Sequence, residues 1–367
     1  MSWVILLLLA ILIPRADASA QHSRDRVMQL QRMLGNGCDE WVTRNGIWGP
    51  KTQAAYQRCR KKSDLPEDID AFMKELWHRK LALILLHQLG YLPEEYDLSD
   101  RNTLTNTLHQ ISIDRGIKPI LKFHPADINR LYQWYVQNPP EGSLGMALRN
   151  RGMPSTSLEI YIQVFKKEEE VHVFAREKGE DSPFAQLKVL PVARSPFTYP
   201  PNGDPKRAGP KTVMGDCKVP EGCYRLTWQN EWSTFYLGYL LSYPHDGDRI
   251  RRKYWEAGSR SGGAIVLHGS DATIGCIPIG DAGIEELFLL LNKNWNAHYG
   301  HGTIHIFPCR FGVPKNERIL RQYGEKRREL VPFWESLRPI YRYFEQNRRI
   351  PRVGFDESTG YYVLKDS

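Results

Sequence analysis

No long apolar segment follows the N-terminal region of the sequence, and this excludes a protein that crosses a membrane several times. Compositional bias is also missing. Of the 367 residues, 25% are charged and 41% are hydrophobic, which excludes disorder throughout and a collagen-like fibre. At about 100–200 residues per domain, the length predicts two or three domains. Acidic residues are the minority, 42 against 50 basic ones, and the net charge of +8 favours anionic partners without selecting among nucleic acid, lipid and cell wall.

The one long apolar run spans Val4 to Ile13. It is too short for a membrane-spanning helix, which takes about 20 residues. Small residues follow it, and Ala18-Ser19-Ala20 fits a signal-peptidase site. We therefore predict a cleaved signal peptide over residues 1–20 and a mature chain that starts at Gln21 and has no integral membrane segment. This chain would lie in the periplasm or be secreted to the cell envelope. An uncleaved anchor is the alternative, because no Lys or Arg precedes the apolar run.

Export would place the cysteines in an oxidising compartment, where disulfides form. Proximity in the sequence predicts two pairs, Cys38 with Cys59 and Cys217 with Cys223. If one cysteine of the six is a working thiol, one of the other five is unpaired. The pairing among these four and Cys309 therefore stays open.

Two helical segments with the same rhythm precede residue 141. Leu34-Gly35 and Leu89-Gly90 lie 55 residues apart, and each is followed by an acidic turn and a Thr-led helix. Such self-similarity predicts a tandem of two helical modules, over residues 21–77 and 78–140. The Pro-containing stretch that comes next predicts a linker over residues 141–157.

The first module carries a distinctive run, Asn45-Gly46-Ile47-Trp48-Gly49-Pro50-Lys51-Thr52, preceded by Leu30-Gln31 and Leu34. With these residues it resembles the peptidoglycan-binding domain of many wall-lytic enzymes, which implies binding to the cell wall. The second copy is looser and lacks the Trp-Gly-Pro element. Taken by chemistry alone, Trp48 and the leucines are typical of the core of a three-helix module.

The hydrophobic pattern changes to a period of two after residue 157. Leu158 to Val164 alternates, and Val171 and Val173 repeat the rhythm, which predicts a hairpin. Further strand-like runs cover residues 187–190, 223–228, 264–268 and 303–307, and one helix covers residues 281–292. The fold class is therefore multidomain α+β, in which a small all-α N-terminal tandem precedes a mostly-β domain over residues 158–312 with one main helix.

A basic C-terminal extension over residues 313–367 is predicted to pack on the mostly-β domain. Residues 311–367 hold twelve Lys or Arg against eight Asp or Glu. Arg318, Arg321 and Lys326-Arg327-Arg328 are typical of the solvated face of a helix. Contact with an anionic wall polymer is the alternative.

The candidate chemistry lies in Ala264 to Glu285, where His268-Gly269 ends an apolar strand and Gly275-Cys276 follows a short polar loop. Glycine beside each residue permits a tight backbone path. A cysteine thiol has a pKa near 8.5, so a neighbouring imidazole is needed to produce the thiolate at neutral pH. The amides of Gly275 and Cys276 are candidate oxyanion donors. From spacing alone, a His and a Cys eight positions apart are more often core residues or half of a disulfide than a catalytic pair.

The sequence around the pair gives it a context: Thr273-Ile274-Gly275-Cys276-Ile277, preceded by His268-Gly269, resembles the signature of the L,D-transpeptidase (YkuD-type) catalytic domain family. The short gap resembles the murein L,D-transpeptidase catalytic domain-like branch. Other segments share the resemblance, namely Pro210-Lys211, Gly215-Asp216, Val219-Pro220-Glu221-Gly222, Tyr224, Tyr243-Pro244, Asp248-Arg249, His305-Ile306-Phe307-Pro308, Phe333-Trp334 and Tyr343-Phe344.

The resemblance implies a nucleophile at Cys276, a base at His268 and a loop-orienting residue at Thr273, with Gly269 and Gly275 as catalytic backbone positions. Substrate contacts are implied at Tyr243, Arg249, Ser270 and Asp271. The sequence departs from the family at Ile274, where many members have His, and at Pro278, where many have Arg. The Gly269 carbonyl is the candidate to orient the imidazole in place of the missing partner.

The function that follows is a cell-wall cysteine L,D-transpeptidase. It would act on peptidoglycan stem peptides through a thioester and transfer the acyl group to an amine, which an envelope lipoprotein could supply. Two alternatives stay open: a hydrolase of the same links with water as acceptor, and an inactive peptidoglycan-binding protein. No nucleic-acid partner and no cofactor are expected. His298, His301 and His305 have a spacing that could hold a metal, but no carboxylate lies within the run, and no metal is expected.

Overall fold

The computed structural model describes residues 24–92, 100–120, 123–154, 156–193, 209–255, 260–293 and 302–365. The predicted signal peptide lies outside the described residues. The chain divides into two compact units, the first comprising Met1–Pro140 with Trp232–Thr234 and the second Glu141–Glu231 with Phe235–Ser367. Within the described parts of the chain, no helix is both long and apolar enough to cross a membrane.

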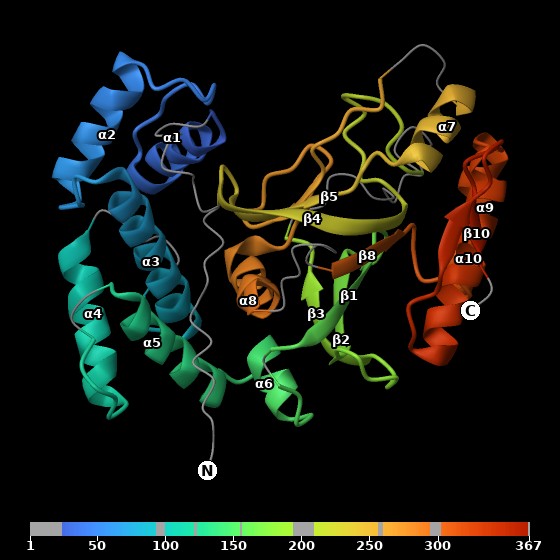
Figure 1. The fold of residues 1–367 in the computed structure, drawn as a ribbon. Helices are drawn as coiled ribbons and strands as arrows, with labels where there is room; N and C mark the ends of the chain where they lie inside the picture. The colour runs from blue at the N-terminus through green and yellow to red at the C-terminus, as the bar shows by residue number, and fades with distance from the viewer. Residues whose placement is uncertain are drawn as a thin grey trace. The chain divides into compact units, whose positions relative to one another are not determined.

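The first unit is helical (Figure 1). Its helices are α1 (Arg24–Cys38), α2 (Pro50–Lys62), α3 (Ile69–Gln88), α4 (Arg101–Asp114) and α5 (Pro125–Gln137). Helix α3 contacts α1, α4 and α5, so it is the central helix of the unit. Its residues Leu81 to Leu86 are all buried. This corrects the predicted module boundary at residues 77 and 78, which falls inside α3, so the two predicted modules share one helix.

The residues behind the peptidoglycan-binding resemblance hold the first unit together. The Gln31 amide donates to Thr52 Oγ1 at 3.0 Å and to Asn45 Oδ1 at 3.1 Å, while its oxygen accepts from the Gly46 amide at 3.0 Å. Gly46 has φ +71°, and a Cβ there would meet the Arg24 backbone carbonyl oxygen at 2.6 Å. Trp48 packs partly buried against the core, which confirms its core assignment.

The predicted disulfide between Cys38 and Cys59 is present, with Cα atoms 5.6 Å apart. The second predicted pair is wrong. Cys217 is an exposed free thiol, and Cys223 lies in a strand, also free. Cys217 sits in a turn with φ +54°, whereas Cys223 is fixed by the sheet, and no disulfide joins them.

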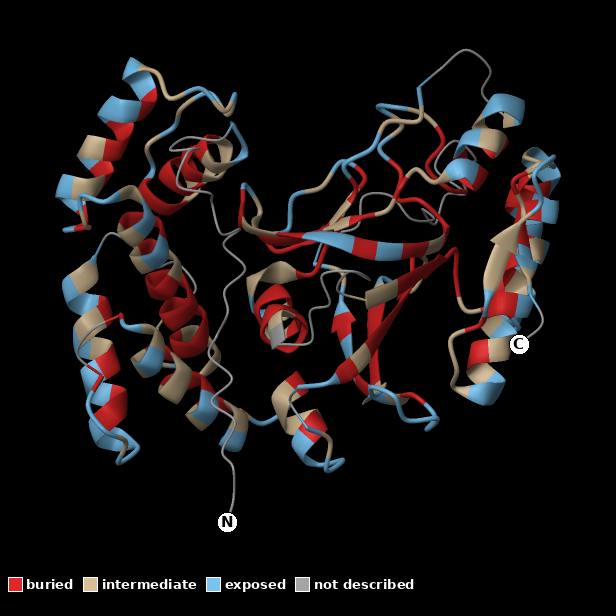
Figure 2. Ribbon diagram, viewed as in Figure 1, coloured by how far each residue is buried: buried red, intermediate tan, exposed pale blue. Residues whose placement is uncertain are grey.

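The second unit is built on an eight-stranded mixed sheet of order β3-β2-β1-β8-β4-β5-β6-β7 (Figure 1). Its strands are β1 (Leu158–Phe165), β2 (Glu170–Glu177), β3 (Ala185–Pro191), β4 (Gly222–Ser233), β5 (Tyr236–Leu241), β6 (Val266–His268), β7 (Ile277–Pro278) and β8 (Gly302–Phe307). The β1–β2 pair is antiparallel, which confirms the predicted hairpin, while β1 pairs with β8 in parallel. Figure 2 shows that β1 and β2 are largely buried.

The second unit is more helical than predicted. The described residues contain α6 (Leu144–Arg149), α7 (Asp246–Trp255), α8 (Gly280–Lys293), α9 (Pro314–Lys326) and α10 (Leu330–Asn347), followed by a hairpin of β9 (Val353–Phe355) and β10 (Tyr362–Leu364). The mixed α+β class is confirmed. Within the predicted domain of residues 158–312, the described residues contain the predicted helix as α8 and one further, shorter helix, α7. Helix α6 also corrects the predicted linker. Ser143 caps it, and the Leu144 amide donates to Glu286 of α8 at 2.8 Å.

The C-terminal helices pack on the sheet. Phe165 and Phe307 of the strands share one apolar cluster with Phe333 and Trp334 of α10. Beneath this cluster the Lys166 ammonium pairs with Glu221 at 2.8 Å, and the other Glu221 oxygen accepts from the Trp334 indole at 2.8 Å. Because a buried ion pair is costly to break, this contact fixes α10 on the sheet.

Candidate functional site

The short strands β6 and β7 bring the candidate nucleophile and base together. They pair in parallel, with Leu267 opposite Ile277 and His268 opposite Pro278. Cys276 immediately precedes β7 and therefore lies beside the start of β6, two positions along the strand pair from His268. Between the strands, the Thr273 hydroxyl accepts from the Gly275 amide at 3.2 Å and the Cys276 amide at 2.8 Å, and donates to the Cys276 carbonyl at 2.9 Å.

Two positions of the site require glycine, because a side chain there would clash with neighbouring atoms. A Cβ at Gly269 would meet Asp281 Oδ1 at 2.5 Å and the Phe235 carbonyl at 3.1 Å. Gly275 has φ +127°, and a Cβ there would lie 2.9 Å from the Lys218 carbonyl oxygen. The backbone therefore passes through both positions only because side chains are absent.

The His268 imidazole is completely buried and fixed in one tautomer. Its Nδ1 lies 2.5 Å from the Gly269 carbonyl, so Nδ1 carries the proton and Nε2 carries the lone pair. The ring stacks on Phe235 with centroids 4.6 Å apart. Nε2 is buried and has no hydrogen-bond partner. Burial lowers the pKa of His268, so the ring is neutral at pH 7 and Nε2 can accept a proton.

The Cys276 thiol makes no hydrogen bond with this nitrogen. Its Sγ donates to the Ala264 carbonyl at 3.7 Å. Burial raises the pKa of Cys276, opposed by a hydrogen bond from the backbone at Val266 and by the charge of Lys211. The resting pair is therefore a neutral thiol beside a neutral imidazole, and their hydrogen bond is not made in this structure. Catalytic hydrogen bonds of this kind often form only when substrate is bound.

The predicted oxyanion donors are occupied. Both amides, of Gly275 and Cys276, donate to the Thr273 hydroxyl. In this arrangement of the loop neither is open to a negatively charged oxygen.

Known proteins resemble this chain in sequence. No protein-family model matches the chain. Over 208 residues the chain is 26% identical to the protein named "Putative L,D-transpeptidase YafK" from Escherichia coli K12, covering 56% of this chain and 73% of that protein. The chain is therefore related to L,D-transpeptidase-like proteins.

Solved structures resemble the chain only distantly. Pgp2, a helical cell shape determining protein from Campylobacter jejuni, is 14% identical with a TM-score of 0.30, covering 58% of this chain and 80% of Pgp2. The L,D-transpeptidase (Yku) from Stackebrandtia nassauensis is 9% identical with a TM-score of 0.21, covering 65% and 93%. Scores this low add nothing to the sequence relationship.

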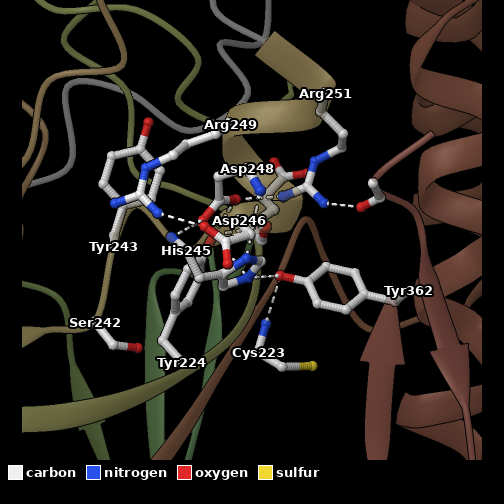
Figure 3. Close-up of polar contacts among 12 residues, drawn as sticks. Cys223, Tyr224, Ser242, Tyr243, His245, Asp246, Asp248, Arg249, Arg251 and Tyr362 are labelled. Atoms are coloured by element: carbon white, nitrogen blue, oxygen red, sulfur yellow. Dashed lines mark hydrogen bonds and ion pairs between the residues drawn. The ribbon is translucent and has the colours of Figure 1, made fainter. Parts of the chain in front are cut away.

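Two of the predicted substrate residues, Tyr243 and Arg249, do not lie on the loop from His268 to Cys276. Tyr243 is buried, and its hydroxyl donates to the Ser261 carbonyl at 3.1 Å, while burial raises its pKa. Arg249 pairs with Asp246 at 2.7 Å on α7, as Figure 3 shows. No contact among the described residues joins Arg249 to the thiol or the imidazole.

Ser270 and Asp271 do lie on the loop that joins β6 to the nucleophile. The Ser270 amide donates to Asp281 Oδ1 at 2.6 Å, at the start of α8, and Asp271 is exposed. Of the nine predicted residues, seven therefore lie on the strand end and loop from His268 to Cys276, and two lie elsewhere.

A buried polar cluster on the same unit explains part of the family resemblance (Figure 3). Asp248 accepts from the Tyr224 hydroxyl at 2.9 Å and from the His245 amide at 3.0 Å, and pairs with Arg251. His245 Nε2 contacts the Tyr362 hydroxyl at 2.8 Å. These residues attach the C-terminal hairpin to α7 and β4, so their role is to hold the domain together.

Of the three histidines whose spacing could hold a metal, only His305 lies among the described residues. His305 is buried in β8 and its Nδ1 contacts the Tyr161 hydroxyl at 2.9 Å, while burial lowers its pKa to about 3. His298 and His301 lie outside the described residues. No metal-type cluster occurs among the residues that the structure describes.

Sequence reasoning assigned no role to a loop that packs beside the site. Pro210-Lys211 and Gly215-Asp216 contributed to the family resemblance, but nothing in their spacing indicated contact with Gly275. That contact is made by Lys218 of the same loop and comes from the fold.

Proposed function

We propose that this protein is a cysteine acyltransferase of the cell envelope that acts on peptidoglycan stem peptides. The observation that carries the proposal is the His268 Nε2, a basic nitrogen that is buried without a partner, two positions along the β6–β7 strand pair from Cys276. The kinship with a protein named as an L,D-transpeptidase supports the substrate class.

The reaction begins with a turn of the Cys276 side chain from the Ala264 carbonyl towards His268. Nε2 then accepts the thiol proton, and the thiolate attacks the carbonyl that joins meso-diaminopimelate to D-alanine. A carbon–sulfur bond forms, the carbon–nitrogen bond breaks, and the imidazolium gives its proton to the leaving amine of D-alanine. Throughout these steps the Gly269 carbonyl holds the ring by Nδ1.

An acceptor completes the reaction. An amine of another stem peptide or of an envelope lipoprotein would attack the thioester carbonyl and form an amide as the carbon–sulfur bond breaks. Its surplus proton would pass through Nε2 to the Cys276 sulfur, which restores the resting pair. Water at the same position would give a free carboxylate. Both acceptors use the same residues, so the geometry favours neither, and the experiment must separate them.

Mass spectrometry of muropeptides incubated with the purified protein tests the proposal. We expect release of D-alanine from tetrapeptide stems, and an amide product that appears when a soluble amine is added. A carboxylate product at every amine concentration would assign the protein as a hydrolase. No change in any muropeptide, with correctly folded protein, would favour the inactive wall-binding alternative.

The helical unit is proposed to tether the enzyme to the wall. A tether raises the effective substrate concentration without changing the chemistry. Full-length protein with Cys276→Ala should therefore sediment with isolated sacculi. Because the chain is basic, this binding should weaken as salt screens its charges. Protein that stays in the supernatant at low salt would contradict the tether.

A further inference from the structure

A compact loop lies between the β3 region and β4, and one carboxylate organises it. We call residues 211–218 the Asp216 loop. The Asp216 carboxylate accepts from three amides of its own loop, those of Thr212 at 2.8 Å, Val213 at 3.1 Å and Lys218 at 3.2 Å. It also accepts from the Lys211 ammonium at 2.8 Å. One side chain therefore fixes the backbone and the position of a cation together.

The Asp216 loop touches the chain on both sides of the nucleophile. On one side, a Cβ at Gly262 would lie 3.4 Å from Lys211 Cε, and Gly262 is two residues before Ala264, whose carbonyl holds the Cys276 thiol. On the other side, the Lys218 carbonyl oxygen would lie 2.9 Å from a Cβ at Gly275. The loop is therefore one wall of the site.

Lys211 is the cation of this wall that packs beside the segment whose Ala264 carbonyl holds the thiol. Its side chain is nearly buried, and its ammonium also donates to the Val213 carbonyl at 2.9 Å. Its positive charge opposes the effect of burial on the pKa of Cys276. The other groups near the nucleophile loop differ in kind. His268 lies on β6 and is neutral at rest, Lys218 brings its backbone carbonyl beside Gly275, and the charge of Asp281 on α8 acts on His268.

We propose that Lys211, on the loop that packs beside Gly262 and Gly275, is a positioning residue that stabilises the Cys276 thiolate. Proton transfer to Nε2 creates a thiolate in a buried environment, and an isolated anion is expensive there. An ammonium held by Asp216 compensates that charge without moving, and so costs little reorganisation. The proposal deepens the proposed function and rests on it for the catalytic consequence, while the effect on the thiol itself can be measured without turnover.

The test is the pH dependence of Cys276 alkylation by iodoacetamide, followed at the Cys276 peptide by mass spectrometry. Lys211→Met should move the inflection upward by roughly one pH unit, the lower end of the effect of a nearby opposite charge. Below the inflection this slows alkylation about tenfold. Lys211→Arg keeps the charge and should restore most of the shift. Lys218→Met is the matched control, since it removes a second buried lysine of the loop but keeps the carbonyl beside Gly275, and it should leave the profile unchanged.

Several outcomes would overturn the inference. One is a Lys211→Met profile identical to wild type, and another is a Lys211→Arg shift as large as that of Lys211→Met. Buried Cys309 reports folding in the same experiment, because it should stay unlabelled in every folded variant. If Lys211→Met exposes Cys309, Lys211→Gln replaces it under the same criteria. If wild type processes no muropeptide but the Lys211→Met profile shifts, the proposed function fails while the role of Lys211 stands.

Discussion

Thr273→Val keeps the shape of the side chain but removes the hydroxyl that ties the nucleophile loop together. That hydroxyl accepts from two amides and donates to one carbonyl, at 3.2, 2.8 and 2.9 Å. A typical hydrogen bond contributes about 1 kcal/mol net, so three lost bonds in a loop that is only partly buried should cost about 2 kcal/mol of unfolding free energy. The larger effect should fall on activity, because the Cys276 amide and carbonyl are both held by this one oxygen.

We expect Thr273→Val to lower the rate of acyl-enzyme formation by about 100-fold, the cost of a small misplacement of reacting groups. Thr273→Ser keeps the hydroxyl and is the matched control, with an expected loss below about tenfold. Single-turnover kinetics on a purified tetrapeptide measures the chemical step, and urea denaturation measures stability. If the valine and serine variants react equally fast, the hydroxyl does not position the nucleophile, and our account of the loop is refuted.

Three further predictions concern the pH response and the framework of the molecule. Because burial lowers the pKa of His268 and its neutral form is the base, kcat/KM should stay constant as pH falls through about 6.5 and decline only below it; a decline centred above that value would contradict a buried neutral base. Glu221→Gln leaves the Lys166 ammonium buried without its countercharge and should cost about 3–5 kcal/mol in urea denaturation, whereas an unchanged midpoint would show that the pair is dispensable. Reduction of the disulfide, whose cysteines are 21 residues apart, should destabilise the helical unit by about 3 kcal/mol, and an equal melting temperature with and without reductant would refute that.

Structural elements that depend on residues close together in the sequence could be predicted from the sequence. Alternation from Leu158 to Val164 predicted β1 and its hairpin, because only one period fits such a run. The spacing of Cys38 and Cys59 predicted their disulfide. The same reasoning failed for Cys217 and Cys223, where proximity in sequence is overridden by a turn at one residue and a strand at the other.

Other features depend on contacts that no local pattern contains. Helix α6 lies in a predicted linker and packs through a bond to Glu286, a residue 142 positions away from its partner Leu144. The motif residue Asp248 was visible as a resemblance, yet only the fold shows that it belongs to the cluster that holds the C-terminal hairpin. Likewise, the approach of Lys218 to Gly275 depends on how two loops pack. The sequence pattern therefore could not predict that the Asp216 loop lies beside the nucleophile.

The central claim is that Cys276 forms a covalent acyl intermediate with His268 as its base. Intact-protein mass spectrometry of the full chain, quenched in acid during turnover of a tetrapeptide stem, tests it most directly. We predict an adduct of tetrapeptide mass less D-alanine, located on the Cys276 peptide, absent from Cys276→Ala and strongly reduced in His268→Ala. Product formation by Cys276→Ala, or turnover by wild type with the adduct on another cysteine, would contradict the account.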